Sequence, residues 1–67
     1  MTKANAISLA RRNTKIRHSS WMEGEWVIIR WNQVIDEHGK AWAVDHFFNV
    51  ICASPQYNIG WRHYETL

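Results

Sequence analysis

The chain has 67 residues, five of them tryptophan, and a formal net charge of +2. A chain of this length forms one domain at most and buries only about 60% of the surface that its unfolded form exposes. Its single cysteine excludes an internal disulfide, and its Cys and His residues are not spaced as zinc ligands would be. We therefore expect stability to depend on a dense aromatic core, on a partner or on self-association.

The charge is unevenly distributed along the chain. Residues 1–18 carry five cationic side chains and no carboxylate, whereas residues 19–67 carry three cations and six carboxylates. This division predicts a basic N-terminal arm or short helix over 1–18 and a small β-rich domain over 19–67, and it points to an anionic partner for the arm. The alternative is a solvated terminus whose charge only aids solubility. The cations of the arm are Lys3, Arg11, Arg12, Lys15 and Arg17.

The sequence carries no signal for export or membrane insertion. The N-terminus lacks the apolar segment of a secretory signal, and no apolar run reaches the roughly 18 residues of a membrane span. The unpaired cysteine agrees with a reducing compartment. We expect a cytoplasmic protein without a membrane span. The small size and lack of catalytic motifs are also typical of proteins encoded by viruses or mobile elements.

Helix-favouring residues dominate the N-terminal segment and predict a short helix near residues 4–12. Thr2 or Asn5 is suited to cap its start. The apolar residues form only a narrow stripe, so we expect the helix to need another surface on which to dock. Residues 13–20 are polar and basic, which predicts a linker or an irregular extended segment. Trp21 is expected to fold back onto the sheet.

Two apolar runs, residues 26–35 and 41–48, flank a short polar break and predict a β-hairpin. Gly39 suits the left-handed position of a type I turn with a G1 bulge, which pairs Asp36 with Lys40.

Extending this register gives two hairpin faces that are both rich in apolar side chains. A second apolar face has to be covered, by the N-terminal segment, a second copy of the chain or another protein. The predicted pairs are Val34 with Trp42, Asn32 with Val44, Arg30 with His46 and Ile28 with Phe48.

The second run also fits a helix, because Val44, Phe47, Phe48 and Ile51 recur at the spacing of one helical face. We favour a strand over residues 41–50, since no capping residue precedes the run and it follows the hairpin turn directly.

After Pro55, which ends the preceding element, residues 59–65 alternate and predict a third strand. This strand would place Ile59, Trp61 and His63 on one face. The sequence thus predicts an α+β fold that is mainly β: a small antiparallel three-stranded meander with a short N-terminal helix or basic arm.

No residue set predicts catalysis, a cofactor or a metal site. The four His residues lie too far apart in sequence to form a readable metal pair. Cys52 lies in an apolar run and is more typical of a small buried hydrophobe than of a nucleophile. The chain has no glycine-rich phosphate loop and no nucleophile motif. We therefore expect a protein that is not an enzyme.

Basic and aromatic residues form the remaining constellation, and two functions use them. Surplus apolar surface favours a small protein-interaction module, a regulator or inhibitor that docks on a larger protein or nucleoprotein. If a second copy of the chain covers this surface instead, the protein is a homodimer. The alternative is a nucleic-acid-binding accessory protein that contacts phosphates through residues 1–18 and stacks exposed rings on bases. The predicted interface or stacking residues are Trp31, Trp42, Trp61, Arg62 and Tyr64.

Overall fold

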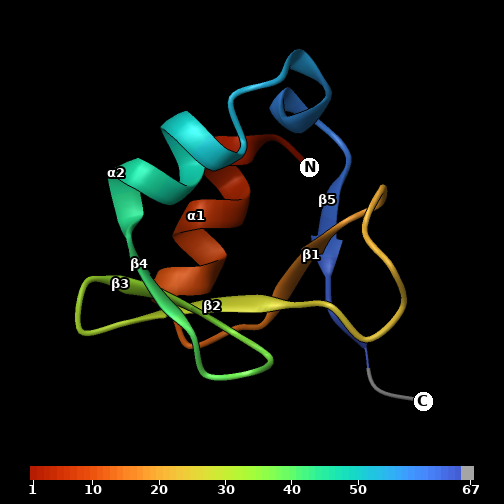
Figure 1. Ribbon diagram of the computed structural model, residues 1–67. Helices are drawn as coiled ribbons and strands as arrows, with labels where there is room; N and C mark the ends of the chain where they lie inside the picture. Colours follow the sequence, from red (N-terminus) through yellow and green to blue (C-terminus); the bar gives the residue numbers. More distant parts are fainter. Residues whose placement is uncertain (66–67) are drawn as a thin grey trace.

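The computed structural model describes residues 1–65 and is an α+β fold on an antiparallel sheet of strand order β4-β3-β2-β1-β5 (Figure 1). The strands are β1 (Ile16–His18), β2 (Val27–Arg30), β3 (Gln33–Asp36), β4 (Ala41–Ala43) and β5 (Trp61–His63). The helices are α1 (Lys3–Arg11), α2 (Val44–His46), a π-helix over Phe47–Ile51 that continues α2, and a 3₁₀ helix over Pro55–Asn58. The mainly β, α+β class predicted from the sequence is confirmed, with five strands in place of three.

Helix α1 forms within one residue of its predicted bounds. Thr2 caps it, because its Oγ1 accepts a hydrogen bond of 3.2 Å from the backbone N–H of Asn5. Ala6 and Ala10 are fully buried and form the face that packs against the sheet. Their small side chains explain why the apolar stripe looks narrow in the sequence although the helix is well docked.

Residues 16–18 form an interior strand where the sequence predicted a linker or an irregular extended segment. Strand β1 lies between β2 and β5, pairing Ile16 with Val27 on one side and with His63 on the other. The prediction was wrong because the strand is only three residues long and its core-facing positions are Ile16 and His18, one of them polar. Its pairing partners lie far away in sequence, which a local pattern does not register.

The run over residues 26–35 is two strands, not one. The chain reverses at Trp31 and Asn32, which have φ angles of 52° and 57° and connect Arg30 directly to its cross-strand partner Gln33. A two-residue loop with positive φ at both positions is a type I′ turn. The sequence hides it because such turns favour Asn-Gly, and a tryptophan in an apolar run indicates a strand instead.

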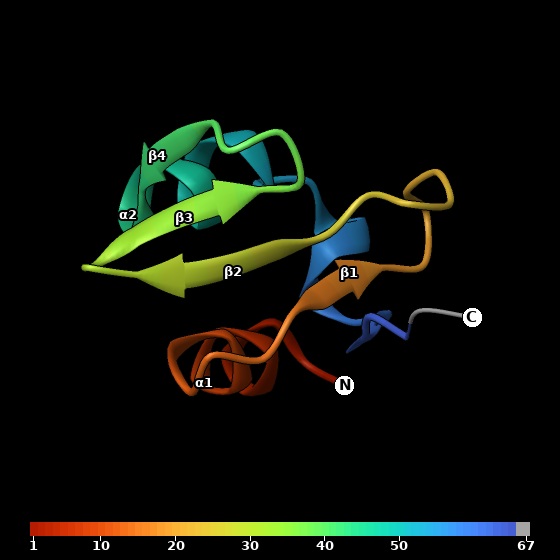
Figure 2. The ribbon, with the colours of Figure 1, turned by 90° about the horizontal axis from the view of Figure 1, so that it is seen from below.

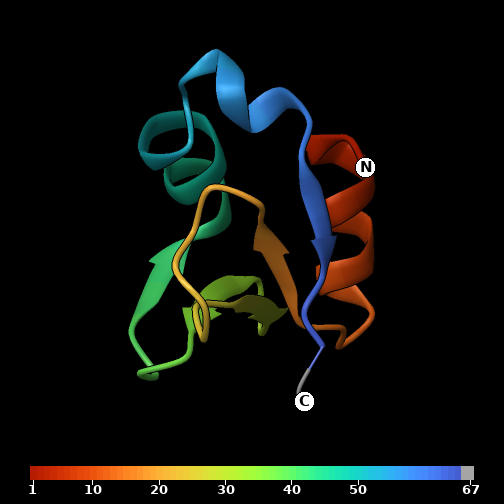
Figure 3. The same ribbon diagram turned by 90° about the vertical axis from the view of Figure 1, so that its right-hand side faces the viewer.

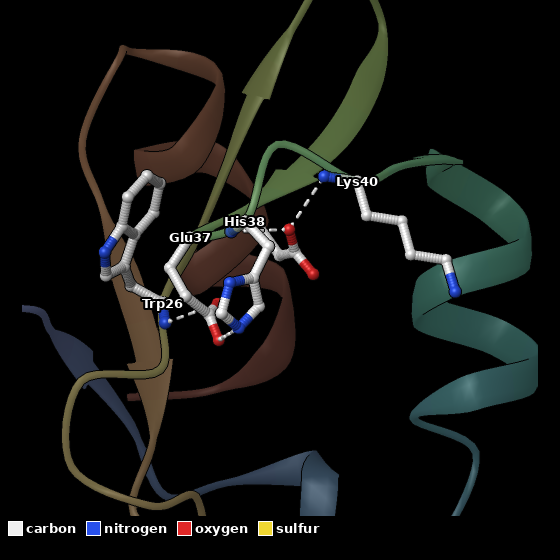
Figure 4. A network of polar contacts seen from close by, with 5 residues as sticks. Trp26, Glu37, His38 and Lys40 are labelled. Carbon is white, nitrogen blue, oxygen red and sulfur yellow. Dashed lines mark hydrogen bonds and ion pairs between the residues drawn. The ribbon is translucent and has the colours of Figure 1, made fainter.

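The second turn forms as predicted. The Asp36 N–H donates to the Lys40 carbonyl at 3.0 Å, and Gly39 has a φ of 81°. The Asp36 Oδ1 also accepts the backbone N–H groups of His38 and Lys40, at 2.9 and 2.8 Å (Figure 4). The pairing of Val34 with Trp42 is confirmed.

The rest of the predicted register is wrong, because β2 pairs with β3 and β4 ends at Ala43. The pairs that do not form are Asn32 with Val44, Arg30 with His46, and Ile28 with Phe48.

Residues 44–51 are helical, so the strand predicted over 41–50 is correct only for Ala41–Ala43. The four apolar residues at helical spacing decide the structure, and they bury Phe47 and Phe48. The N-terminus of this helical segment has no side-chain cap, but its C-terminal end is capped from elsewhere in the chain, because the Lys3 Nζ donates to the carbonyls of Phe48 and Cys52 at 2.9 Å each. An ammonium group at a helix C-terminus satisfies free carbonyls and the negative end of the dipole.

Both helical elements lie on the same side of the strongly twisted sheet, and the core fills the space between them (Figures 1 and 3). The N-terminal segment is therefore the cover that one face of the hairpin required. Trp21 folds back onto this core as predicted, with its ring edge-on to those of Trp61 at 5.4 Å and Phe47 at 6.3 Å. The buried cluster consists of Ala6, Ala10, Ile16, Val27, Ile29, Val34, Phe47, Phe48, Cys52 and Trp61.

The third predicted strand is present as β5, shortened to Trp61–His63. Trp61 is buried, whereas Ile59 and His63 are exposed, so the face expected to hold all three is only partly covered. No helix among residues 1–65 has the length and apolar character needed to cross a membrane.

Candidate interaction site

Four of the five cations in the N-terminal segment make contacts within the fold, namely Lys3, Arg11, Lys15 and Arg17. Lys3 binds the carbonyls that end the π-helix. Arg17 is half-buried and its Nη2 donates to the Trp21 carbonyl at 2.7 Å. The Lys15 Nζ lies 4.2 Å from the ring centroid of Trp26, which is a cation–π contact. These cations do not form one row along a surface.

Arg11 and Arg12 are exposed at the end of α1, beside the tip of the β2–β3 hairpin. The Arg11 Nη1 donates to the Asn32 Oδ1 at 3.2 Å. From the hairpin side, the Arg30 Nε donates to the Asn13 Oδ1 at 3.0 Å. Two hydrogen bonds in opposite directions thus fix the helix end against the hairpin tip. We call this region, formed by Arg11, Arg12, Arg30, Trp31 and Asn32, the hairpin-tip surface.

Trp31 is the most unusual residue of that surface. It is 87% exposed and has a left-handed backbone, with φ at 52°. A bulky side chain in that conformation is a genuine outlier, and the left-handed region costs about 1–2 kcal/mol for a residue other than glycine. Trp31 therefore buries almost nothing in the fold while adding strain to the turn. Such strain is characteristic of binding sites.

Of the other predicted tryptophans, Trp61 belongs to the interior and Trp42 is partly exposed. Trp61 is 2% exposed, and its Nε1 donates to the Tyr57 carbonyl at 2.7 Å. Trp42 is half-buried against Phe47, and the Lys40 Nζ lies 5.1 Å from its ring centroid. Trp61 thus has no free face on which a base or a partner ring stacks.

Arg62 and Tyr64 line an open groove of about 890 Å³ along β5. Arg62 is directly opposite Arg17 in the β1–β5 pairing, so two cations are cross-strand neighbours. The carboxylates of Glu23 and Glu65 also line the groove, which gives it mixed charge. The ten predicted residues therefore do not form one site: Arg17, Trp61, Arg62 and Tyr64 line the groove along β5, whereas Arg11 and Trp31 lie at the hairpin tip.

The titratable residues of the core are satisfied or neutral. The Ser20 N–H donates to the His18 Nδ1 at 3.1 Å, so the proton is on Nε2, which donates to the carbonyls of Gln56 and Ile59. Burial raises the pKa of the Cys52 thiol to about 11, although the nearby Lys3 lowers it in part. A neutral buried thiol is a poor nucleophile.

Among residues 1–65, no three side chains of the His, Cys, Asp and Glu types are grouped closely enough to hold a metal ion. Comparison with protein-family models, with curated proteins and with solved structures finds no match to this chain.

The sequence missed Arg30 and Asn32 as parts of this surface because it placed both inside a strand. A signal was present, since the polar residues Asn32 and Gln33 interrupt an apolar run and Asn tolerates the left-handed conformation.

Proposed function

We propose that this chain is a small non-enzymatic protein-interaction module, a regulator or inhibitor that docks on a larger protein through the hairpin-tip surface. The observation that supports this most directly is Trp31, exposed and strained on a rigid two-residue turn. Tryptophan and arginine are the residue types most enriched among interface hot spots. At the hairpin tip the exposed Trp31 is flanked in the turn by Arg30 and by Asn32, which accepts a hydrogen bond from Arg11.

The fixed backbone supports this role. A ring on a short turn between paired strands loses little conformational freedom on binding, which reduces the entropic cost of association. The hydrogen bonds of Arg11 to Asn32 and of Arg30 to Asn13 hold the neighbouring guanidinium groups in place. A preorganised anchor is effective for docking and unnecessary for folding.

Nucleic-acid binding is the second candidate, because the same tip offers three guanidinium groups and a stacking ring. Against it, Lys3, Lys15 and Arg17 make contacts inside the fold, so the charge of the N-terminal segment is not gathered along one phosphate-binding track. The absence of a reactive thiol at Cys52 supports a non-enzymatic role, and the free cysteine fits a cytoplasmic location.

The test is affinity capture from lysate with and without nuclease, using the unaltered chain, Trp31→Asn and Met22→Asn. Met22 is 75% exposed and lies outside the hairpin tip, which makes it a matched control. We expect a protein partner that survives nuclease treatment, remains with Met22→Asn and is lost with Trp31→Asn. Capture of the same partner by all three chains would contradict the proposal.

Partners lost on nuclease treatment would instead support nucleic-acid binding. Direct titration with a single-stranded oligonucleotide then measures the salt slope, which a phosphate-binding surface makes steeply negative. A second copy of the chain as the partner would appear as a dimer by light scattering at the protein concentration used for capture.

A further inference from the structure

A second concave feature lies at the other end of the β2–β3 hairpin from Trp31 and is lined by residues of the loop over 19–26, the Asp36–Lys40 turn and the π-helix. Figure 2 shows this loop and this turn at the end of the hairpin that is opposite the β2–β3 turn. Its open volume is about 210 Å³. That is below the roughly 300–1,000 Å³ of sites for small-molecule ligands, so the groove has room for one long side chain and not for a cofactor. We call it the aromatic groove.

Five of the eleven residues that line the aromatic groove are aromatic. Trp21, Trp26, Trp42 and Phe47 line it, together with Tyr57. The Trp21 and Trp42 rings pack against Phe47, at 6.3 and 5.3 Å between centroids, which fixes their orientation. Aromatic faces carry negative quadrupole potential and attract cations that lie within about 6 Å of the ring centroid.

Every charged residue that lines the groove is acidic. Glu25, Asp36 and Glu37 contribute carboxylates, and no Lys, Arg or His side chain is present in the lining. This is the opposite of the hairpin-tip surface, although the whole chain has a net charge of +2. Rings and carboxylates together form a surface that is complementary to a cation with an apolar stem.

The three carboxylates differ in how much of their hydrogen-bonding capacity is used. The Asp36 Oδ1 is occupied by two turn N–H groups. The Glu37 carboxylate lies between the Trp26 N–H, at 3.4 Å, and the His38 ring, at 3.6 Å, as Figure 4 shows. Within residues 1–65, the Glu25 carboxylate has no hydrogen bond or ion pair at all although Glu25 is half-buried, so it is the group left to receive a donor.

The chain itself already pairs cations with two of these rings. The Nζ of Lys15 lies 4.2 Å from the Trp26 ring centroid and that of Lys40 lies 5.1 Å from the Trp42 centroid. Neither lysine lines the groove, and Figure 4 shows the Lys40 side chain directed away from Glu37. Both rings thus already hold a lysine of the chain outside the groove, and the groove lining itself contains no cationic residue.

We infer that the aromatic groove binds an arginine side chain of a partner protein, with the guanidinium stacked on a tryptophan ring and donating to the Glu25 carboxylate. Arginine fits better than lysine, because its planar head stacks on rings and donates to carboxylates as a fork. The inference rests on the proposed function in one respect, since it gives the chemistry of a second contact with a protein partner. It does not depend on Trp31.

The test uses a blocked peptide, acetyl-Gly-Ser-Arg-Ser-Gly-amide, titrated into the full chain and followed through the tryptophan Nε1–H signals by NMR. We expect saturable shifts of Trp21, Trp26 and Trp42 with an apparent Kd of about 1–10 mM, the range open to one side chain. Trp31 acts as the internal reference and should not shift. The lysine peptide should bind about threefold more weakly, and the citrulline peptide, which is neutral and nearly isosteric, at least about tenfold more weakly.

Two matched pairs of variants locate the site. Glu25→Gln should weaken binding by about three- to tenfold, whereas Glu23→Gln, two residues away and outside the groove, should leave it unchanged. Ile51→Lys introduces a competing cation at a lining position and should abolish binding, whereas Val50→Lys, which is on the same turn but not in the lining, should not. Both isoleucine and valine are at least 45% exposed, so neither change threatens the core.

Equal binding of the citrulline peptide, equal shifts of all five tryptophans, or unchanged affinity in both Glu25→Gln and Ile51→Lys would each overturn the inference. So would an acidic peptide that shifts the same three signals. Trp31→Asn should bind the arginine peptide normally even if it captures no partner, so failure of this inference and failure of the proposed function give different results.

Discussion

Replacing Trp31 with asparagine should make the protein more stable, which is the reverse of the usual effect of removing a tryptophan. Only about an eighth of the residue is covered, since 87% of it is exposed. A fully buried aromatic covers about 150–250 Å², so the loss is about 20–30 Å², or about 0.5–0.8 kcal/mol at 25 cal/mol per Å². The left-handed backbone at φ 52° costs about 1–2 kcal/mol, and asparagine tolerates it.

The difference between the strain and the lost contact predicts a net gain of about 0.2–1.5 kcal/mol in the free energy of unfolding for Trp31→Asn. For a domain of this size, 1 kcal/mol corresponds to about 4–8 °C in Tm. Far-UV circular dichroism melts measure it without relying on tryptophan emission. Trp31→Ala provides the contrast, because alanine loses the same contact and keeps the strain, so its Tm should fall slightly.

Met22→Asn controls for the loss of any exposed apolar side chain and should leave Tm within about 2 °C of the unaltered chain, as surface substitutions usually do. If Trp31→Asn melts at the same temperature as Trp31→Ala, or below it, the turn is not strained at Trp31. Trp31 would then carry no cost for folding, and its exposure alone would not mark it as a binding residue.

Three further changes test the fold. Lys3→Met removes two hydrogen bonds of 2.9 Å to helix carbonyls and should lower the free energy of unfolding, measured in urea, by about 1.5–3 kcal/mol. Arg12→Met is the control and should be nearly neutral, so an equal loss of stability in both variants would contradict the capping role of Lys3. Gly60 has a φ of 92°, and an added Cβ would lie 3.0 Å from two side-chain atoms, so Gly60→Ala should lower the free energy of unfolding by about 2–4 kcal/mol. Gly24 has a φ of 91° but open space around it, so the control Gly24→Ala should lower it by only about 1–2 kcal/mol. The pKa of Cys52 is raised from 9.0 to about 11 in the folded chain, so the stabilisation that the protonated thiol gives is complete below pH 9 and is lost as the pH rises toward 11. Between these values the free energy of unfolding should fall by about 1 kcal/mol per pH unit. A Cys52→Ala chain with the same slope would refute this.

The sequence predicted those features that short-range chemistry determines. The α1 helix follows from composition and a Thr2 cap, and the Asp36–Lys40 turn follows from Gly39 and the Asp36 side chain. Each depends on residues within about five positions of one another.

The features that the sequence missed depend on distant partners. Strand β1 exists because Ile16 pairs with both Val27 and His63. The helix over residues 44–51 has no side-chain cap at its N-terminus, and the carbonyls at its C-terminal end accept hydrogen bonds from Lys3. At the candidate site, Arg11 reaches Asn32 only because the hairpin turns at Trp31 and Asn32. Such a turn favours the sequence Asn-Gly, whereas this chain has Trp-Asn there.

The Lys3 cap also bears on folding during synthesis, because Lys3 leaves the ribosome before the carbonyls that it binds. Its acceptors lie 45 and 49 residues further along the chain. At about 5–20 residues per second, synthesis leaves the N-terminal segment without them for roughly 2–10 s. Closing so large a loop is slow compared with forming a helix. A nascent chain truncated before Phe48 therefore lacks both acceptors of the Lys3 ammonium, and its N-terminal segment should be cleaved by a protease more readily than in the full chain.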